Sequence, residues 1–265
     1  MPEGHTVHRL ARRHQRLFRG HAVHVSSPQG RFAESAQLVD GQVFAGADAW
    51  GKHLVHRYRN GLMVHVHLGL YGRFDEQSQP MDPPVGAVRM RLESETVGVD
   101  LRGPTACEIY SPAQLEALVA RLGPDPLRVD ADPEKAWAAV GRSARPIGAL
   151  MMDQKVMAGV GNVYRAEVLF RARINPFRSG TKITREEFDE IWADLVMLMP
   201  IGVRRNAIHV IRDEDDHGAP SYRTGRPRTY VYRRAGEPCR ICGTEIAIAE
   251  LEARKVYWCP QCQAV

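Results

Sequence analysis

The 265-residue sequence contains no long hydrophobic run, no low-complexity tract and only five cysteines. No window approaches the roughly 20 consecutive apolar residues that a membrane-spanning helix needs, and the first residues lack the apolar core of a secretory signal. These absences favour a cytoplasmic protein without membrane attachment, a setting in which disulfides are rare. An apolar fraction of 44% is still enough for ordinary hydrophobic cores, and the length predicts two domains with a small appendage.

The net charge is positive, and most of the basic residues are arginines. The formal net charge is +5 and the isoelectric point is near 9.1. Arginine suits phosphate, because its planar guanidinium group donates two parallel hydrogen bonds. A charge this modest leaves two interpretations open, a nucleic-acid-binding protein and a basic enzyme whose charges are simply solvated.

The first hundred residues carry the pattern of β-strands. In the segment 64–68 the apolar residues alternate with His65 and His67, and in 88–92 they alternate with Arg89 and Arg91. Alternation with a period of two is typical of half-buried strands. Residues 3–18 have helical spacing, so an antiparallel β-sandwich packed with one helix is the simplest assembly.

After residue 111 the hydrophobic period becomes helical. Ser111 and Gln114 form one predicted capping box, and Thr184 and Glu187 form a second one. The sequence therefore predicts an α+β multidomain protein in four segments. These are a sandwich domain over 1–124, a helical domain over 125–212, a linker over 213–228 and a C-terminal module over 229–265.

Four cysteines predict a structural zinc site in the C-terminal module. Two Cys-x2-Cys pairs stand sixteen residues apart, at Cys239, Cys242, Cys259 and Cys262. This spacing brings four thiolates onto one tetrahedral ion and leaves no open position for chemistry. Disulfides are the alternative, and no export signal supports them. Residues 250–258 between the pairs can form a β-hairpin with Arg254 and Lys255 near its tip, and the fifth cysteine, Cys107, is interpreted as a buried small residue.

The N-terminus suggests a nucleophile. A small second residue favours removal of Met1, which would expose the secondary amine of Pro2. α-Amino groups titrate near pH 7.7–8, so a useful fraction is neutral and can attack a sugar carbon to form a Schiff base. The adjacent Glu3 carboxylate could protonate the sugar ring oxygen or stabilise the cationic intermediate. The alternative is that Met-Pro-Glu is only a common way for a chain to begin.

Four motifs follow one another along the chain: Pro2-Glu3-Gly4, Trp50-Gly51-Lys52, the hexapeptide GVGNVY at 159–164 and the octapeptide GEPCRICG at 236–243. With the cysteine spacing, this set resembles the Fpg/Nei family, formamidopyrimidine-DNA glycosylase and endonuclease VIII, and most of all the endonuclease VIII branch of actinobacterial type. The resemblance spans the whole chain. It implies an N-terminal β-sandwich, a central helix-two-turn-helix domain and a C-terminal zinc-finger hairpin.

The resemblance also implies roles for single residues. Pro2 would be the Schiff-base nucleophile and Glu3 its acid, while Lys52 would bind a backbone phosphate and assist elimination. Asn162 would bind phosphate, and its position also predicts an N-cap for a helix starting at Val163. Arg254 would grip the phosphates around the lesion and serve δ-elimination. Arg121 would contact DNA, although a cation at the end of a helix is the simpler interpretation.

Leu70 and Tyr71 favour the endonuclease VIII branch. They follow a predicted strand, as in the loop that fills the gap left by a flipped nucleotide, whereas two core residues are the alternative. Gly69 stands where that branch has glutamine, which leaves the contact to the orphaned base open. The chain also lacks the arginine-phenylalanine wedge of the Fpg branch after Arg102.

We therefore predict a monomeric bifunctional glycosylase/lyase that binds damaged DNA and removes oxidised bases, above all pyrimidines, by β,δ-elimination. Zinc is its one expected metal. Two rival functions have different requirements. A non-enzymatic zinc-ribbon protein would not need Pro2, and a monofunctional hydrolase would use Glu3 to activate water without forming an imine.

Overall fold

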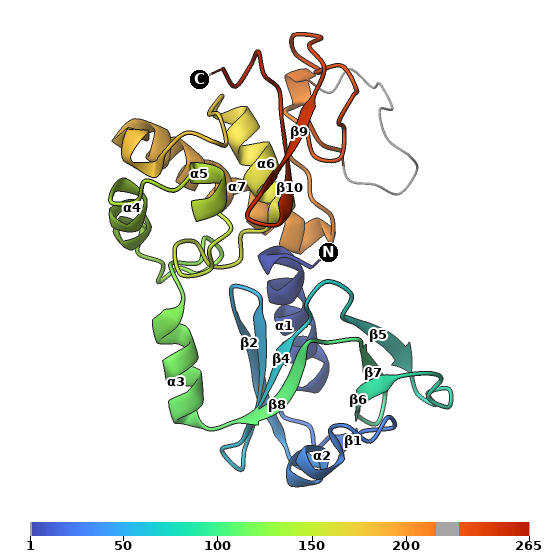
Figure 1. Cartoon of the computed structure of the whole chain (residues 1–265). Helices are drawn as coiled ribbons and strands as arrows, with labels where there is room; N and C mark the ends of the chain where they lie inside the picture. The colour runs from blue at the N-terminus through green and yellow to red at the C-terminus, as the bar shows by residue number, and fades with distance from the viewer. Residues whose placement is uncertain (1, 216–227, 265) are drawn as a thin grey trace. The chain divides into compact units, whose positions relative to one another are not determined.

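The computed structural model describes residues 2–215 and 228–264. Most of the expected linker, 213–228, lies outside these residues. The chain divides into two compact units, Met1–Arg121 and Leu122–Val265, just before the boundary at 124 expected from the sequence (Figure 1). Each unit has its own hydrophobic core.

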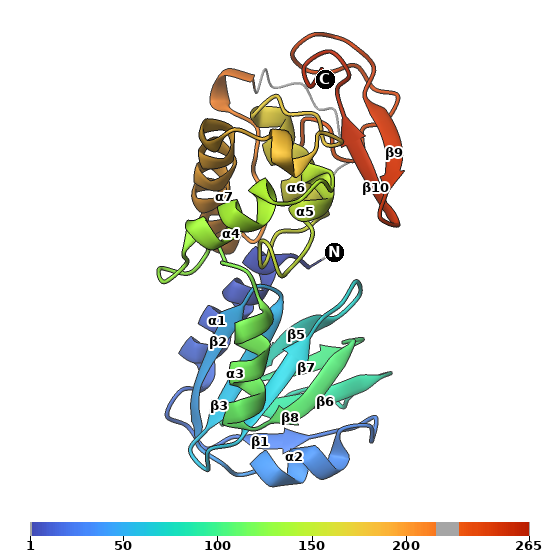
Figure 2. The ribbon, with the colours of Figure 1, turned by 60° about the vertical axis from the view of Figure 1, so that its left-hand side comes forward.

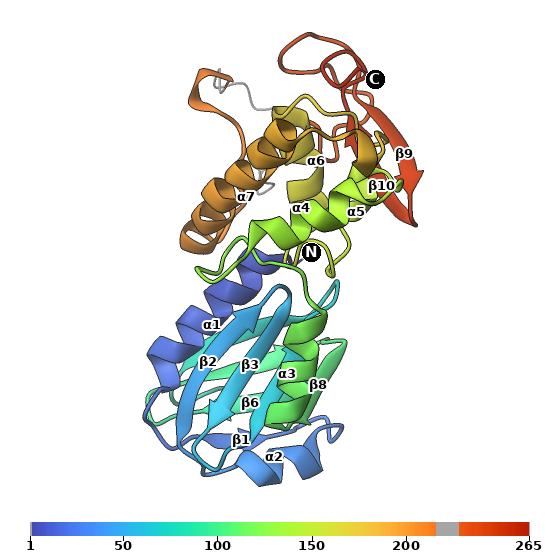
Figure 3. The same ribbon diagram turned by 90° about the vertical axis from the view of Figure 1, so that its left-hand side faces the viewer.

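The first unit is an antiparallel β-sandwich, as predicted. One sheet has the strand order β2-β3-β4-β8 and the other has the order β1-β6-β7-β5 (Figure 3). The first sheet consists of β2 (Phe44–Trp50), β3 (His53–Tyr58), β4 (Met63–His67) and β8 (Ala106–Tyr110). The second consists of β1 (His24–Ser26), β6 (Val88–Glu93), β7 (Val97–Arg102) and β5 (Arg73–Ser78). Three helices complete the unit, namely α1 (Gly4–Phe18), α2 (Ala33–Val39) and α3 (Pro112–Arg121).

Helix α1 packs on β2 and seals the sandwich core. It buries Val7, Ala11 and Phe18 in the same cluster as the inward side chains of both sheets. The Gln15 side chain enters a bulge in β2, where its Oε1 atom accepts a hydrogen bond of 2.7 Å from the backbone N–H of Ala47. A Cβ atom on Gly46 would lie 2.8 Å from that oxygen, so a larger residue there would displace the end of the Gln15 side chain. This contact fixes the helix that carries the N-terminal residues.

The expectation of half-buried strands is wrong for two polar positions. His65 is 3% exposed and its ring stacks on Tyr110 of β8. Arg91 is 7% exposed and forms a bidentate ion pair with Asp100, with N–O distances of 2.7 and 2.9 Å. Both faces of these strands are covered, and the polar groups are compatible with burial because each has a hydrogen-bonding partner.

A buried histidine pair lies in the sandwich core and makes the first unit sensitive to acid. His14 Nδ1 and His56 Nε2 are 2.9 Å apart, and both rings are surrounded by aromatic side chains. Burial lowers the pKa of His14 from 6.5 to about 3, and it lowers the pKa of His56 well below 6.5. Below pH 6.5 the two imidazoles are therefore protonated in the unfolded chain but stay neutral in the folded chain. The free energy of unfolding decreases as the pH is lowered.

We expect the pair to lower the free energy of unfolding by about 4 kcal/mol when the pH is lowered from 7.5 to 5, with roughly 2 kcal/mol from each imidazole. The urea midpoint should drop accordingly over this range. A His14→Gln/His56→Gln protein should be less stable at pH 7.5 but should lose less stability on acidification. The exposed His21→Gln change provides the matched control and should keep the wild-type slope. Parallel slopes for the wild type and the double variant would contradict this account.

The second unit contains the predicted helical domain. Its helices are α4 (Pro133–Gly141), α5 (Ile147–Leu150), α6 (Asn162–Arg171) and α7 (Arg185–Arg205), with two 3-10 turns, η1 (Gly180–Lys182) and η2 (Asp213–Asp215). The capping box of Thr184 and Glu187 is present at the start of α7. The helix buries Phe188, Ile191 and Leu195 in one core, which confirms the helical hydrophobic period expected after residue 111. Ser111 and Gln114 likewise form their predicted capping box ahead of α3.

The C-terminal module contains a two-stranded hairpin of β9 (Ala247–Leu251) and β10 (Arg254–Trp258) (Figure 2). Its two-residue turn, Glu252-Ala253, has positive φ at both positions, as tight hairpins require. The module packs on α6 through a core that includes Phe170, Tyr230 and Tyr257. No helix among the described residues is long and apolar enough to cross a membrane.

Candidate active site and zinc centre

The predicted nucleophile and its acid stand at the start of α1. Pro2 is half-buried, and Glu3 occupies the N-cap position of the helix. The Glu3 backbone carbonyl accepts the first helical hydrogen bond, from Thr6 N–H at 2.9 Å, but its side chain makes no capping bond. That carboxylate is fully buried. It is therefore held at a helix N-terminus, which stabilises negative charge, and beside the nitrogen of Pro2 in the chain.

Lys52 lies in the same unit, at the tight turn between β2 and β3. Gly51 adopts a φ of +57°, a left-handed conformation that favours glycine, and the turn reverses the chain within two residues. The Lys52 side chain is half-buried. Because α1 packs on β2, the helix that follows Pro2 is in direct contact with the strand that leads to Lys52.

Leu70 and Tyr71 form an exposed turn between β4 and β5. The backbone N–H of Gly72 donates to the Leu68 carbonyl at 2.9 Å, and Gly69 has a φ of +66°. Leu70 is 42% exposed and Tyr71 is 83% exposed, so the interpretation of these two as core residues is wrong. Large apolar side chains held on a tight turn are available to a partner.

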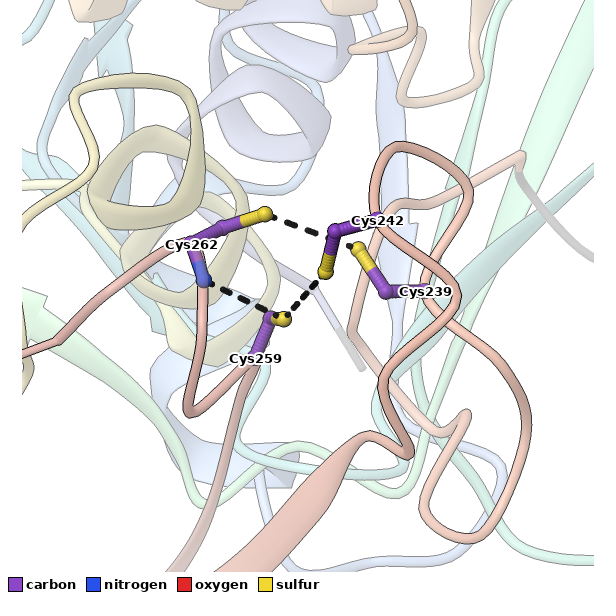
Figure 4. Close-up of side chains that lie close together, drawn as sticks. All are labelled: Cys239, Cys242, Cys259 and Cys262. Atoms are coloured by element: carbon purple, nitrogen blue, oxygen red, sulfur yellow. Dashed lines mark hydrogen bonds between the residues drawn. The ribbon is translucent and has the colours of Figure 1, made fainter.

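The four cysteines converge as predicted (Figure 4). All four sulfur atoms lie within 4.8 Å of one another, with Cys239–Cys262 at 3.9 Å and Cys242–Cys259 at 3.4 Å. A tetrahedral Zn²⁺ with bonds of about 2.3 Å needs sulfur atoms about 3.8 Å apart, so the set fits the ion. Among the described residues this is the one cluster with metal-ligand geometry.

The thiols of the zinc site differ in their surroundings. Burial raises the pKa of Cys259 and that of Cys262. The pKa of Cys242 is instead lowered to about 6, mainly by a hydrogen bond with Thr244. Zinc binds thiolates, so the ion would displace protons from Cys259 and Cys262. The zinc affinity is therefore expected to fall as the pH falls.

Asn162 and Arg254 are brought together by α6 and the hairpin. Asn162 is the first residue of α6, and Gly161 is the N-cap, so the predicted capping role of Asn162 is wrong. Its side chain instead donates from Nδ2 to the backbone carbonyl of Lys255 at 3.0 Å. Lys255 follows Arg254, which is exposed at the first pair of the hairpin. The contact joins residues that are 93 positions apart.

A buried arginine that sequence reasoning missed holds this junction. Arg165 is 1% exposed and donates from Nη2 both to Asn162 Oδ1 and to the Lys255 carbonyl, the latter at 2.9 Å. At the other side of the tip, Arg145 forms a bidentate pair with Glu252, with N–O distances of 3.0 and 2.9 Å. No local signal could have revealed either residue, because both act on the hairpin across long sequence separations.

Two further predicted positions are placed by the structure. Arg121 is the exposed last residue of α3, where a cation also complements the helix C-terminus. Cys107 in β8 is mostly enclosed, and burial raises its pKa to about 12. Such a thiol is not a nucleophile at neutral pH, which agrees with its interpretation as a small buried residue.

Three domain families match consecutive parts of the chain. These are the formamidopyrimidine-DNA glycosylase N-terminal domain over residues 1–107, the formamidopyrimidine-DNA glycosylase H2TH domain over 122–213 and the zinc finger found in FPG and IleRS over 236–265. The protein named Endonuclease 8 1 from Mycobacterium tuberculosis is 61% identical over 267 residues, which cover 99% of this chain and 100% of that protein. The chain belongs to the Fpg/endonuclease 8 family. The match to a mycobacterial endonuclease 8 confirms the predicted branch.

Solved structures of Fpg proteins share the fold of this Fpg/endonuclease 8 family member. The MutM (Fpg) protein from Thermus thermophilus is 29% identical, with a TM-score of 0.78 and coverage of 99% of this chain and 98% of that one. A Lactococcus lactis Fpg in complex with DNA containing an abasic site is 19% identical, with a TM-score of 0.81 and coverage of 99% and 100%. These likenesses confirm the fold predicted from the sequence, a β-sandwich followed by a helical domain and a zinc-finger hairpin.

Proposed function

We propose that this chain is a bifunctional DNA glycosylase and abasic-site lyase of base excision repair, and that it removes oxidised bases, above all pyrimidines, from damaged DNA. The observation that carries the proposal is the Pro2-Glu3 pair at the start of α1, with the Glu3 carboxylate fully buried, in a chain that aligns end to end with an endonuclease 8. We expect the protein to act as a monomer in the cytosol, where its DNA substrate lies.

The proposed reaction begins at the Pro2 nitrogen. Once Met1 is removed, the neutral secondary amine attacks C1′ of the flipped nucleotide, the bond from C1′ to the base breaks, and the base leaves with the bonding electrons. The Pro2 nitrogen loses its proton, Glu3 donates the proton that opens the sugar ring, and a positively charged imine (an iminium ion) forms between Pro2 and C1′. Loss of the C2′ proton and of the 3′ phosphate is the β-elimination, and loss of the 5′ phosphate is the δ-elimination.

The remaining predicted residues would hold the DNA. Lys52 supplies a cation for a backbone phosphate in the first unit, and it serves the elimination. Asn162 and Arg254 supply a second phosphate site, which is supported by the hydrogen bond from Asn162 to the residue beside Arg254. The zinc ion supplies folding energy to the hairpin that carries Arg254, because its four cysteine ligands leave no position for a substrate.

Borohydride trapping tests the proposed function. The protein, with processing to Pro2 verified by mass spectrometry, is incubated with duplexes carrying an abasic site, an oxidised pyrimidine or an oxidised purine. The expected result is a reduced covalent adduct that maps to Pro2 and forms faster on the oxidised pyrimidine than on the purine. Base release without an adduct would instead identify a monofunctional hydrolase, and binding without release would identify a non-enzymatic DNA-binding protein.

The exposed turn gives a separate prediction. The Tyr71→Ala change should weaken excision from duplex DNA roughly 10-fold or more, since loss of one stacking side chain costs about 1–3 kcal/mol. Cleavage of a single-stranded substrate should change less, because no orphaned base has to be stabilised there. Val129→Ala removes another fully exposed apolar side chain and provides the control. Equal losses on duplex and single-stranded substrates would argue against a gap-filling role for Tyr71.

A further inference from the structure

An ion-pair cluster joins the turn of the zinc-module hairpin to the helical domain. Arg145 donates from Nε and Nη2 to the two carboxylate oxygens of Glu252, with N–O distances of 3.0 and 2.9 Å. Its Nη1 atom donates to Asp153 Oδ2 at 2.9 Å. One guanidinium group therefore binds a carboxylate in the hairpin turn and a second carboxylate just after α5. We refer to these three side chains as the Arg145 cluster, and all of them belong to the second unit.

The backbone that carries Arg145 is held on both sides. The Arg145 carbonyl accepts a hydrogen bond from Gly180 N–H at 2.9 Å, and the Arg145 N–H donates to Ser143 Oγ at 3.3 Å. The next residue, Pro146, forms an isolated β-bridge with Ser179. The guanidinium group therefore extends from a chain segment that the helical domain itself fixes in place.

The Asp153 carboxylate connects the cluster to the segment ahead of α6. Its Oδ1 atom accepts from the Lys155 backbone N–H at 3.0 Å, while Oδ2 accepts from Arg145. Partial burial opposes ionisation, but the hydrogen bond from Arg145 lowers the pKa of Asp153. Asp153 begins the segment 153–161, which leads directly to Asn162. Arg145 therefore contacts the connection to one residue of the proposed phosphate site.

The Glu252 end of the cluster lies two residues from Arg254, the other residue of that site. Glu252 and Ala253 form the hairpin turn, and Arg254 begins β10. The strand ahead of the turn approaches α5 closely, because a Cβ atom on Gly148 would lie 3.2 Å from Leu251 Cδ2 (Figure 3). The turn is therefore attached to the helical domain both by packing and by the ion pair.

Arg254 stands between two points of attachment. On one side the Lys255 carbonyl accepts from Asn162 at 3.0 Å and from Arg165 at 2.9 Å. On the other side the turn is bound by Arg145. The Arg254 side chain is exposed and forms no ion pair with any carboxylate in the described part of the chain. Its backbone is thus fixed while its guanidinium group stays available to a phosphate.

The acid in the turn has no role in binding DNA directly. A free Glu252 carboxylate two residues from Arg254 would repel a backbone phosphate. In the cluster its charge is paired with Arg145, and both of its oxygens accept hydrogen bonds from that residue. Glu252 is therefore suited to anchoring the turn.

We propose that the Arg145 cluster positions Arg254: by binding the hairpin turn to the segment ahead of Asn162, it keeps the two phosphate-binding residues at a fixed spacing. The inference rests on the proposed function, in which both residues bind a backbone phosphate. Arg145, Glu252 and Asp153 are positioning residues, since they act on DNA through Arg254. The Arg145 and Glu252 side chains are 42% and 50% exposed, so their pair contributes geometry more than stability.

The test measures DNA binding by the full chain. The probe is a duplex with a tetrahydrofuran analogue of an abasic site, which cannot form an imine, and Kd is measured from about 50 to 200 mM salt. Arg145→Met keeps the length of the side chain but removes its charge and its donors. Arg185→Met is the matched control, because Arg185 also binds two carboxylates, Glu134 and Asp189, at a similar exposure of 44%, and both partners lie outside the zinc module.

We expect Arg145→Met to weaken binding roughly 10-fold, the effect of losing one hydrogen bond to a charged group. The slope of log Kd against log salt should become shallower by about one, because one phosphate contact is lost. Arg254→Met should produce the same two changes, and the double variant should bind no more weakly than either single variant. Arg185→Met should bind like the wild type. Additive losses in the double variant would show that Arg145 contacts DNA itself and would overturn the positioning role.

Glu252→Met separates positioning from simple charge. It removes a negative charge near the phosphate, so electrostatics alone predicts tighter binding, whereas loss of the anchor predicts weaker binding. One zinc ion per chain in each variant shows that the module is still folded. Tighter or unchanged binding by Glu252→Met would contradict the proposal, as would wild-type binding by Arg145→Met. Borohydride trapping with the wild-type protein tests the proposed function separately, since none of these binding measurements requires an imine.

Discussion

A protein that carries Gly-Ser ahead of Pro2 is expected to lose strand cleavage and borohydride trapping by roughly 1000-fold or more, the order of loss seen when a covalent nucleophile is removed. The extension turns the Pro2 nitrogen into an amide, which has no basic lone pair and cannot form an imine. Helix α1 should be unaffected, because its first hydrogen bond is accepted by the Glu3 carbonyl and none involves the Pro2 nitrogen. Rates on abasic and oxidised duplexes measure the effect.

The control for this prediction is the same protein after protease cleavage that regenerates Pro2 as the first residue. Cleavage should restore both activities, since nothing else differs. Glu3→Gln separates the two chemical steps. It should slow formation of the covalent adduct with an oxidised base about 100-fold, because ring opening loses its acid, yet still allow an imine with a pre-formed abasic site, whose aldehyde is already available. Full activity of the extended protein would exclude Pro2 as the nucleophile.

Features governed by local spacing were predictable from the sequence. The capping boxes at Ser111 and Thr184 and the zinc ligands depend on residues a few positions apart, and the structure confirms them. A capping box satisfies backbone groups within one helical turn, and a Cys-x2-Cys turn places two thiolates on one ion whatever surrounds it. The order of the sandwich, the helical domain and the zinc finger followed from the same kind of signal together with the family motifs.

Features that depend on distant neighbours were not predictable. The alternating pattern of β4 indicates which residues share a face, but it does not show that Tyr110 of β8 covers His65. Asn162 stands where an N-cap is common, and only the hairpin 93 residues away explains why its side chain turns to Lys255. The burial of Arg165 is explained in the same way, by its hydrogen bond to the Lys255 carbonyl of the hairpin. The residues that connect separate elements are therefore those for which the structure was needed.

Zinc removal is expected to have the second large effect. Cys259→Ala should abolish stoichiometric zinc binding and unfold the module over residues 229–264, since structural zinc supplies about 10–16 kcal/mol of folding free energy to such modules. Cleavage should fail because Arg254 and the Asn162 contact lose their hairpin. The first unit should remain folded, because its core contains no residue of the zinc module. Zinc content and hydrogen exchange measured segment by segment would show this division.

Cys107→Ser provides the matched control, because it removes a thiol from β8 and leaves the four ligands intact. It should bind one zinc ion and keep its activity. Chelation of the wild-type protein should reproduce Cys259→Ala and should proceed more readily at pH 6 than at pH 8, because burial raises the pKa of Cys259 and Cys262 and protons then compete with zinc. A zinc-free protein that still cleaves abasic DNA at the wild-type rate would show that the hairpin folds and holds Arg254 without the metal. We expect the opposite, because the hydrophobic core of so small a module buries too little apolar surface to fold it without zinc.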